Sequence, residues 1–331
     1  MIPAIVGIAG PALTEAEAAL FRRLPPAGAI LFARNVVDPA QLGALTAALR
    51  AVLPDGAVLM VDQEGGRVAR LRPPYWQAHP PAGAIGALFE RRPAAGLRAA
   101  WLTGALIGAQ VAGMSFDVVA APVLDLGLPG AHNVIGDRAY AADPAAVARL
   151  GRAMADGLLA AGVQPVGKHA PGHGRARADS HLSLPVVEAN DLSADVLPFA
   201  LNADLPWAMT AHFLYPAWDA ACPATLSPTV IGAVIRERIG FRGVLVTDDL
   251  AMKALSGPPA ASAAAALRAG CDIALYCSGD AGNTEAVLRG CPPMTEAAAR
   301  RVRDGRALAR ARRLPLDPAA LGAERDRLLA S

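Results

Sequence analysis

Two pairs of side chains in this sequence have the types and spacing needed for covalent acid/base chemistry. Asp248 and Asp249 follow the apolar run 243–247, and neighbours on an extended segment point opposite ways, so only one can face a substrate. Asp179 and His181 are two residues apart, so both can face the same way in an extended loop. A histidine held by an aspartate transfers protons near neutral pH. The pattern indicates a strand-end carboxylate and a His–Asp pair suited to proton transfer, and spacing alone leaves open whether Asp248 or Asp249 faces a substrate.

Further polar residues stand where other apolar runs end. A buried strand has no structural use for a charge or an imidazole at its end. The carboxyl ends of parallel strands in a closed barrel converge on one face, where active sites lie. The strand-end residues are Asp62, Asp125, Lys168, His169, His212 and Asp248. We therefore expect them to surround a common site.

The elements that must position these residues are eight short apolar runs. Runs without alternation are typical of parallel strands buried on both faces. Helical patterns lie between them, and some open with an N-cap followed by a proline, as at Asp38 and Pro39. The expected strands are 4–8, 29–32, 57–61, 117–124, 163–167, 207–211, 243–247 and 271–276. The expected helices between them are 14–24, 39–52, 93–111, 144–161, 192–203, 228–239 and 259–269.

This alternation predicts a parallel sheet with right-handed crossovers. Eight strand–helix units favour a closed (β/α)8 TIM barrel of the α/β class, and an open doubly wound sheet is the alternative. The dinucleotide fingerprint G-x-G-x-x-G is missing after the first strand. We expect residues 1–331 to form a single catalytic domain, with an outer helix at about 295–314 and a tail after 315 that packs on the barrel or frays.

Composition argues against several classes of protein. The 31 Lys and Arg residues nearly balance 29 Asp and Glu, without the basic face of a nucleic-acid binder. No apolar stretch reaches the roughly 20 residues of a membrane span, and the first residues lack the basic region of a signal peptide. The four cysteines form no C-x-x-C pair, which favours a reduced, cytoplasmic setting. We expect a monomer without nucleic-acid or membrane partners.

Four sequence blocks together resemble glycoside hydrolase family 3. They are VDQEGGRV at 61–68, NVIGDRAY at 133–140, GKHAPGHG at 167–174 with ADSH at 178–181, and VTDDLAM at 246–252. The resemblance extends from about residue 5 to 280. Within the family, the chain resembles the single-domain bacterial β-N-acetylglucosaminidases more than the β-glucosidases. Family 3 β-glucosidases generally carry a second domain, for which this chain has no room.

The resemblance implies a retaining enzyme that removes terminal β-linked N-acetylglucosamine from peptidoglycan fragments, the GlcNAc-1,6-anhydro-muropeptides, without a cofactor or a metal. Such cleavage needs a nucleophile and an acid/base on opposite sides of the bond. The resemblance selects Asp248 as the covalent nucleophile, His181 as the acid/base and Asp179 as its partner. It assigns the sugar-holding roles to Asp62, Arg70, Arg138, Lys168 and His169.

The chain departs from the family pattern at four positions. Ala170 replaces a usual Phe, Thr247 and Ala251 replace serines beside the nucleophile, and Ala139 replaces a Ser after Arg138. None of these changes removes a titrating group. The Phe-to-Ala change is expected to loosen packing beside the sugar-holding residues.

Other interpretations of the same residues stay open on the sequence. Lys168 at a strand end could form a Schiff base. His169 and His173 could suggest a metal pair, although Pro171 and Gly172 between them exclude a helix. A family 3 β-glycoside phosphorylase or β-glucosidase would use the same site. The alternative from another class is a non-catalytic sugar-binding barrel.

Residues outside these roles have weaker predictions. Arg67 is expected to support a site carboxylate, and Asp125 to support the site or to cap a loop. Asp249 is expected to cap the next helix, and His173 to bond within its own loop. Three histidines belong to none of the four sequence blocks. We expect His212 on the rim of the site, and His79 and His132 at the surface.

Overall fold

The structure, a computed structural model, describes residues 1–130, 133–175 and 184–331. The predicted acid/base pair, Asp179 and His181, lies outside the described residues, and so does His132. The roles expected of these three residues therefore stay predictions.

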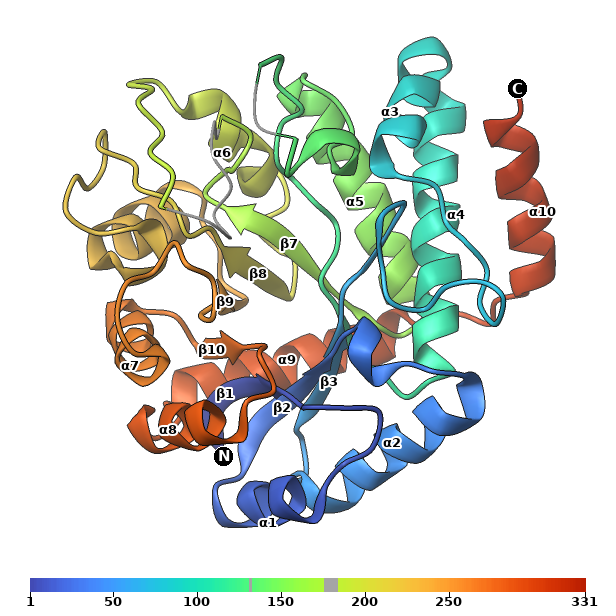
Figure 1. The fold of residues 1–331 in the computed structure, drawn as a ribbon. Helices are drawn as coiled ribbons and strands as arrows, with labels where there is room; N and C mark the ends of the chain where they lie inside the picture. Colours follow the sequence, from blue (N-terminus) through green and yellow to red (C-terminus); the bar gives the residue numbers. More distant parts are fainter. Residues whose placement is uncertain (131–132, 176–183) are drawn as a thin grey trace.

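Eight parallel strands close into a barrel in the order β1-β10-β9-β8-β7-β6-β3-β2 (Figure 1). This topology confirms the predicted (β/α)8 barrel and shows that the alternative of an open doubly wound sheet is wrong. The barrel strands are β1 Ile2–Gly7, β2 Pro26–Leu31, β3 Val58–Val61, β6 Val118–Val119, β7 Gln164–Ala170, β8 Trp207–Thr210, β9 Val244–Asp249 and β10 Ile273–Tyr276.

Strand β6 is much shorter than the predicted run 117–124. The Asp117 carboxylate accepts a hydrogen bond from the backbone N–H of Leu59 at 2.7 Å, so its side chain bonds to the neighbouring strand. Pro122 has no N–H to donate to a ladder. The backbone N–H of Leu124 still donates to the Lys168 carbonyl at 2.7 Å. The chain therefore follows the barrel wall to Asp125 without regular pairing.

Helices surround the barrel, and their first turns follow the expected capping chemistry. The Thr14 hydroxyl accepts from the Glu17 N–H at 3.2 Å while the Glu17 carboxylate accepts from the Thr14 N–H at 2.9 Å. Asp38 accepts from the Gln41 N–H at 2.8 Å. The helices are α1 Glu15–Arg23, α2 Pro39–Val52, α3 Ala82–Arg91, α4 Pro93–Ala112, α5 Pro144–Ala160, α6 Ser193–Ala200, α7 Pro259–Ala269, α8 Ala281–Gly290, α9 Glu296–Arg312 and α10 Pro318–Leu329, with a π-type helix at Val230–Arg238.

The residues after 315 form helix α10, which packs against α4 and α3 on the outside of the barrel (Figure 1). Asp317 caps this helix by accepting from the N–H groups of Ala319 and Ala320 at 3.0 and 3.1 Å. An aspartate followed by Pro318 was a usable start signal in the sequence. Helices α3 and α8 were also not predicted.

The strands are apolar throughout because both of their faces are buried. Alternate residues such as Ile5, Ile30 and Met60 belong to a cluster that fills the barrel interior. Their neighbours Ala4 and Val6 pack outward against the helices. Side chains thus close the barrel, and the site lies above them at the carboxyl ends of the strands. In the ranges that the structure describes, no helix is long and apolar enough to cross a membrane.

Candidate active site

Asp62 and Arg70 are brought together by a hairpin that follows β3. Its strands are β4 Gln63–Gly65 and β5 Val68–Ala69. Gly65 and Gly66 make the turn with φ values of +100° and +54°, and a Cβ on Gly65 would lie 2.3 Å from the Pro80 carbonyl oxygen. Glycine suits both positions, because it adopts positive φ freely and has no Cβ to block the close backbone approach.

Five charged residues at the mouth of the barrel form a network that we call the charge cluster: Asp62, Glu64, Arg70, Arg138 and Lys168. The Lys168 ammonium lies 3.1 Å from an Asp62 oxygen and 2.6 Å from a Glu64 oxygen. Arg138 donates two hydrogen bonds to Glu64, both at 2.8 Å. Arg70 donates to the second Asp62 oxygen at 2.9 Å. Strands β3 and β7, the hairpin and the loop before α5 thus supply one interlocked set of charges.

Pairing keeps the charge cluster ionised although it is buried. Burial raises the pKa of Asp62, but Lys168 and Arg70 outweigh this effect and hold the pKa far below its usual value. Burial likewise raises the pKa of Glu64, but Lys168 and Arg138 outweigh this effect, so the pKa of Glu64 lies below its usual value. Burial lowers the pKa of Lys168, but the two carboxylates raise it above its usual value. A permanently protonated amine is a poor nucleophile, which argues against the Schiff-base interpretation of Lys168.

Glu64 was not among the predicted site residues, although it holds both Lys168 and Arg138. Its side chain is 7% exposed, so two ion pairs are what make its charge tolerable there. Asp62 and Glu64 are two residues apart, so an extended segment presents both on one face. That spacing was the sequence signal that could have identified Glu64.

His169, at the end of β7, is oriented by the buried Asp125. The ring Nδ1 lies 2.7 Å from an Asp125 oxygen, and the same carboxylate accepts from the backbone N–H of His173 at 2.7 Å. The peptide bond between Lys168 and His169 is cis. Asp125 therefore supports the site, which is the first of the two roles expected of it.

Asp248 ends β9 and has few partners of its own. One of its oxygens accepts from the Asp249 backbone N–H at 2.8 Å, and no cation among the described residues forms an ion pair with it. Burial raises the pKa of Asp248, but the nearby His169 and this N–H outweigh it, so the pKa lies below its usual value. The carboxylate is therefore ionised and not neutralised by a direct partner.

Asp249 does not cap a helix, because the next helix begins only at Pro259. Its carboxylate accepts from the backbone N–H groups of Ala251 and Cys277, at 2.9 and 3.0 Å. Burial raises the pKa of Asp249. Its carboxylate ties the turn after β9 to the end of β10, so the prediction of a helix cap was wrong.

The histidines near the site are mostly engaged by the protein. His212 bonds Thr225 through Nδ1 at 2.8 Å and the Asp249 carbonyl through Nε2 at 3.0 Å, so it supports the end of β9. His173 donates its backbone N–H to Asp125, in another loop; because residues 176–183 of its own loop lie outside the described residues, its expected bonding within that loop stays a prediction. The His173 ring packs edge-on against Phe213, and burial lowers the pKa of His173 to about 3.

One further histidine, His79, does not lie where the sequence analysis placed it. His79 is 8% exposed and bonded on both ring nitrogens, so its predicted surface position was wrong.

Ala170 lines an apolar cavity of about 10 Å³, so neighbouring side chains close most of the space that a Phe would take. The half-exposed Arg67 pairs with Asp137 at 3.0 Å and donates to the Asn133 carbonyl at 2.7 Å, in the loop before Arg138. Asp137 does not line the cavity that contains the predicted site residues, so the expected support of a site carboxylate by Arg67 is not borne out.

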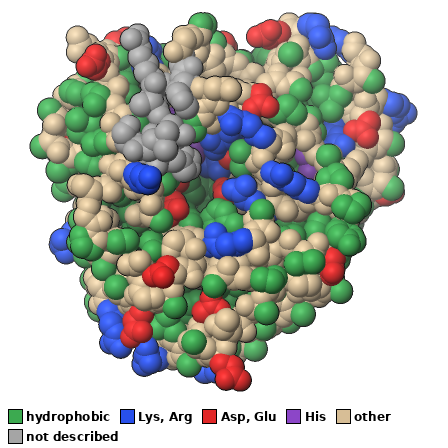
Figure 2. Space-filling model, viewed as in Figure 1, with side chains coloured by type: hydrophobic (Ala, Val, Ile, Leu, Met, Phe, Trp, Pro, Cys, Tyr) green, Lys and Arg blue, Asp and Glu red, His purple; other side chains and the backbone are tan. Residues whose placement is uncertain are grey.

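The predicted residues that the structure describes line one cavity of about 190 Å³ at the mouth of the barrel. They are Asp62, Arg70, Arg138, Lys168, His169 and Asp248, and the lining also includes Phe32, Glu64, His173 and Cys277. Figure 2 shows basic side chains gathered around a hollow near the centre of this face. The volume is below the roughly 300–1,000 Å³ of sites for drug-sized ligands, so it suits one small ring.

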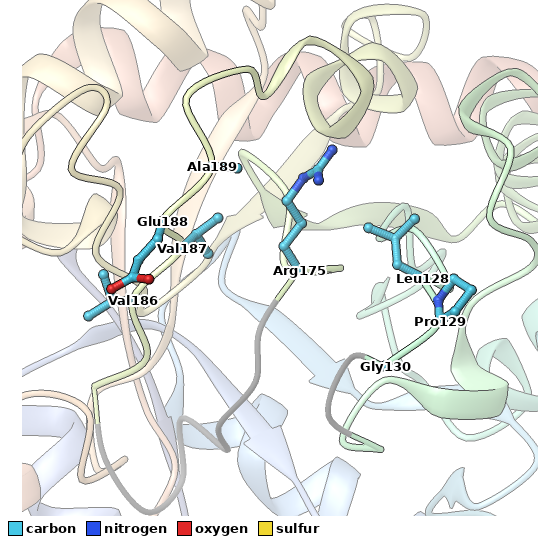
Figure 3. A pocket seen from close by; sticks show the side chains of 8 residues that line it. All are labelled: Leu128, Pro129, Gly130, Arg175, Val186, Val187, Glu188 and Ala189. Atoms are coloured by element: carbon cyan, nitrogen blue, oxygen red, sulfur yellow. The ribbon is translucent and has the colours of Figure 1, made fainter.

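A second cavity, of about 420 Å³, lies between residues 128–130 and 186–189. Figure 3 shows Leu128 and Pro129 on one side of Arg175, with Val186 and Glu188 on the other. The Arg175 Nε donates to Asp195 at 2.7 Å. None of the predicted site residues that the structure describes lines this cavity, so its greater size does not make it the reactive site.

A closed parallel barrel with a charged, sugar-sized cavity at the carboxyl ends of its strands defines a TIM-barrel enzyme acting on a small polar ring. The family model described as "Glycosyl hydrolase family 3 N terminal domain" matches residues 8–304. The chain belongs to glycosyl hydrolase family 3.

Named relatives and solved structures agree with this family. The chain is 42% identical over 283 residues to "Beta-hexosaminidase" of Bordetella parapertussis, covering 83% of this chain and 80% of the relative. It is 41% identical over 283 residues to "Beta-hexosaminidase" of Alkalilimnicola ehrlichii, covering 83% and 80%. It is also similar to NagZ from Neisseria gonorrhoeae in complex with N-trifluoroacetyl-D-glucosamine, with a TM-score of 0.88 and 32% identity over 99% of this chain and 98% of that one.

Proposed function

We propose that this protein is a retaining β-N-acetylhexosaminidase that removes terminal β-linked N-acetylglucosamine from peptidoglycan fragments of the GlcNAc-1,6-anhydro-muropeptide type. One observation carries the proposal: the ionised Asp248 lines the same small cavity as the charge cluster and His169. The activity is the one named for the relatives with about 42% identity. The peptidoglycan substrate rests on the resemblance of the sequence blocks.

In the proposed first step, an Asp248 oxygen bonds to the anomeric carbon as the bond to the leaving oxygen breaks. His181, held by Asp179, gives its proton to that oxygen. In the second step water attacks the anomeric carbon, His181 takes a water proton, and Asp248 is released. The transition states carry oxocarbenium charge, which the Asp248 carboxylate stabilises.

The charge cluster is proposed to hold the sugar. Lys168, Arg70 and Arg138 offer N–H donors that are fixed by their ion pairs, and Asp62 offers acceptor oxygens. His169, oriented by Asp125, presents its other ring nitrogen. Donors held by partners lose little freedom on binding, which favours a defined ring position.

Three further statements belong to the proposal. Residues 1–331 act as one catalytic domain, the protein is a monomer, and it works in the cytoplasm. These rest on the sequence patterns given above. Gel filtration with light scattering tests the second statement, because a single 33.9 kDa species is expected for a monomer.

The first experiment is a screen of aryl β-glycosides: N-acetylglucosaminide, glucoside and xyloside, each with wild type and Asp248→Asn. The N-acetylglucosaminide is expected to react fastest, and Asp248→Asn to lose nearly all turnover. Faster cleavage of the glucoside would contradict the proposed sugar. Each assay is repeated with added phosphate, and release of sugar 1-phosphate instead of free sugar would show a phosphorylase.

The acid/base role is tested separately with His181→Ala. This variant is expected to lose far more turnover on poor leaving groups than on activated aryl glycosides, because activated groups depart without a proton. Asp179→Asn should show the same pattern to a smaller degree. Equal losses on both kinds of substrate would remove His181 from the acid/base role.

A further inference from the structure

Helix α10 lies outside the barrel and after residue 304, where the family match ends, yet it sends one charged side chain inward. Arg325 on this helix is 3% exposed. Its Nη1 lies 2.8 Å from the Nδ1 of His79, in the segment between β5 and α3. A buried arginine is costly unless its N–H groups find acceptors, so this contact fixes both partners.

The contact with Arg325 determines the protonation of His79. A guanidinium only donates hydrogen bonds, so Nδ1 must accept and the ring proton sits on Nε2. Nε2 lies 2.7 Å from the Oε1 of Gln110, on α4, and donates to it. Burial, with the charge of Arg325, lowers the pKa of His79 to about 4. The imidazole is therefore neutral, in one tautomer, and held from two helices.

The His79 segment is the support of the turn in the active-site hairpin. The Gly66 backbone N–H donates to the His79 carbonyl at 2.9 Å. The Pro80 carbonyl oxygen and Pro81 fill the space where side chains on Gly65 and Gly66 would stand, at 2.3 and 2.7 Å from their ideal Cβ positions. A shift of this segment would therefore move the turn directly.

The residues on either side of that turn reach the charge cluster. Glu64 precedes it and holds Lys168 and Arg138. Arg67 follows it and binds the carbonyls of Asn133 and Val134, in the loop that leads to Arg138. An unbroken chain of hydrogen bonds and backbone contacts thus runs from α10 to the sugar-holding residues.

We propose that Arg325 and His79 are positioning residues for substrate binding: Arg325 fixes the His79 ring, and the His79 segment fixes the turn that aligns Glu64 with Lys168 and Arg138. Neither residue touches the cavity, so both act through the hairpin. The inference rests on the proposed function only for the choice of substrate in the kinetic assay.

The chain offers a matched control on the same helix. Arg98, on α4, donates two hydrogen bonds to Glu324 at 2.7 and 2.8 Å, so it also anchors α10. This pair is exposed, and within the part of the chain that the structure describes it forms no hydrogen bond or ion pair with the His79 segment. Loss of either arginine weakens the docking of α10, but only loss of Arg325 releases His79.

The experiment compares Arg325→Met, Arg325→Lys and Arg98→Met with wild type. For Arg325→Met we expect KM to rise about tenfold with kcat within about twofold, well short of the hundredfold loss that about 1 Å of misplacement can cause. Arg325→Lys keeps a donor and should recover most of the affinity. Arg98→Met should keep the wild-type KM even where it lowers the melting temperature.

Hydrogen exchange of the peptide covering residues 62–71 provides a readout that needs no substrate. The Gly66 amide should exchange faster in Arg325→Met and at the wild-type rate in Arg98→Met. Unchanged KM and exchange in Arg325→Met, or equal changes in Arg98→Met, would overturn the proposal. Should Arg325→Met not fold, Arg325→Gln replaces it under the same criteria. Wild type that cleaves no glycoside would instead refute the proposed function, and exchange would still test the positioning role.

Discussion

Two sets of carboxylates share the mouth of the barrel and differ in how their charges are compensated. Asp62 and Glu64 are bound by Lys168, Arg70 and Arg138 within 3.1 Å. Among the described residues, one backbone N–H donates to Asp248 and no cation forms an ion pair with it. The ion pairs fix the positions of Asp62 and Glu64, while the Asp248 carboxylate, without an ion-pair partner among the described residues, remains free to act as a nucleophile.

The difference follows from what each set is proposed to do. A group that binds substrate gains from being immobilised before the substrate arrives. A nucleophile held in a salt bridge would have to give up that bridge as it bonds to carbon. This loss would raise the activation free energy of the first step. The nearby His169 and His212, together with the Asp249 N–H, keep the pKa of Asp248 below its usual value without such a bridge.

The largest expected effect is the loss of activity in Asp248→Asn. Removal of a covalent nucleophile should lower kcat by about 10⁴-fold, or roughly 5.5 kcal/mol. The free energy of unfolding should stay within about 0.5 kcal/mol, because no ion pair is lost. Steady-state kinetics and urea unfolding measure the two quantities. A large loss of stability would mean that Asp248 is a structural partner like Asp62.

The opposite result is expected for Lys168→Met. This change leaves Asp62 and Glu64 as neighbouring buried carboxylates without their shared cation, so unfolding should become about 3–5 kcal/mol easier. KM should rise as well, because Arg70 and Arg138 are no longer held in place. Lys253→Met, at an exposed position, is the control and should change neither quantity. A stable Lys168→Met protein would show that the ion pairs do not hold the charge cluster together.

The pH dependence of stability separates the paired carboxylates from buried neutral histidines. The folded pKa of His79 is about 4 against an ordinary 6.5, so the unfolded chain binds more protons between these values. The contribution of His79 should therefore be complete above pH 6.5 and fall by roughly 3 kcal/mol as the pH drops to 4, and His173, whose pKa is lowered to about 3, should add a further loss over the same range. The carboxylates, with depressed pKa values, should add a further loss only below about pH 4. Urea unfolding of wild type and His79→Gln checks the first phase, which should be weaker in the variant.

The smallest effect is expected at the edge of the charge cluster. Arg67 and Asp137 are about half exposed, so Arg67→Met should cost about 1 kcal/mol or less of stability and raise KM only a few-fold. Arg138→Met breaks the buried bidentate pair with Glu64 and should cost several times more. Parallel unfolding and KM measurements compare the two. Similar losses would mean that burial does not set the strength of these pairs.

The sequence was enough to predict the barrel and the strand-end residues, because the positions of polar residues relative to apolar runs are local signals. Strand β9 ends at Asp248 and Asp249, and β7 carries Lys168 and His169, as the runs indicated. The preference for Asp248 over Asp249 came from the family resemblance. The structure adds a reason, since the Asp249 carboxylate is bound to two backbone N–H groups.

What the sequence did not reveal depends on contacts between distant segments. Glu64 bonds residues 74 and 104 positions away, and His79 meets Arg325 across 246 positions. No periodicity or motif encodes such pairs, so the partners of Glu64 could not be foreseen and His79 was placed at the surface. Strand β6 likewise ends at Val119, shortly before Pro122, which has no N–H to donate to a ladder.

The most direct test of the central claim is to trap the proposed intermediate. An N-acetylglucosaminyl fluoride with a second fluorine at C5 disfavours oxocarbenium charge in both steps, while its good leaving group keeps the first step fast. Digestion and mass spectrometry then locate the sugar. The account predicts one labelled residue, Asp248, and no label in Asp248→Asn. A label on Asp249 or another residue, or turnover of the N-acetylglucosaminide without any label, would contradict it.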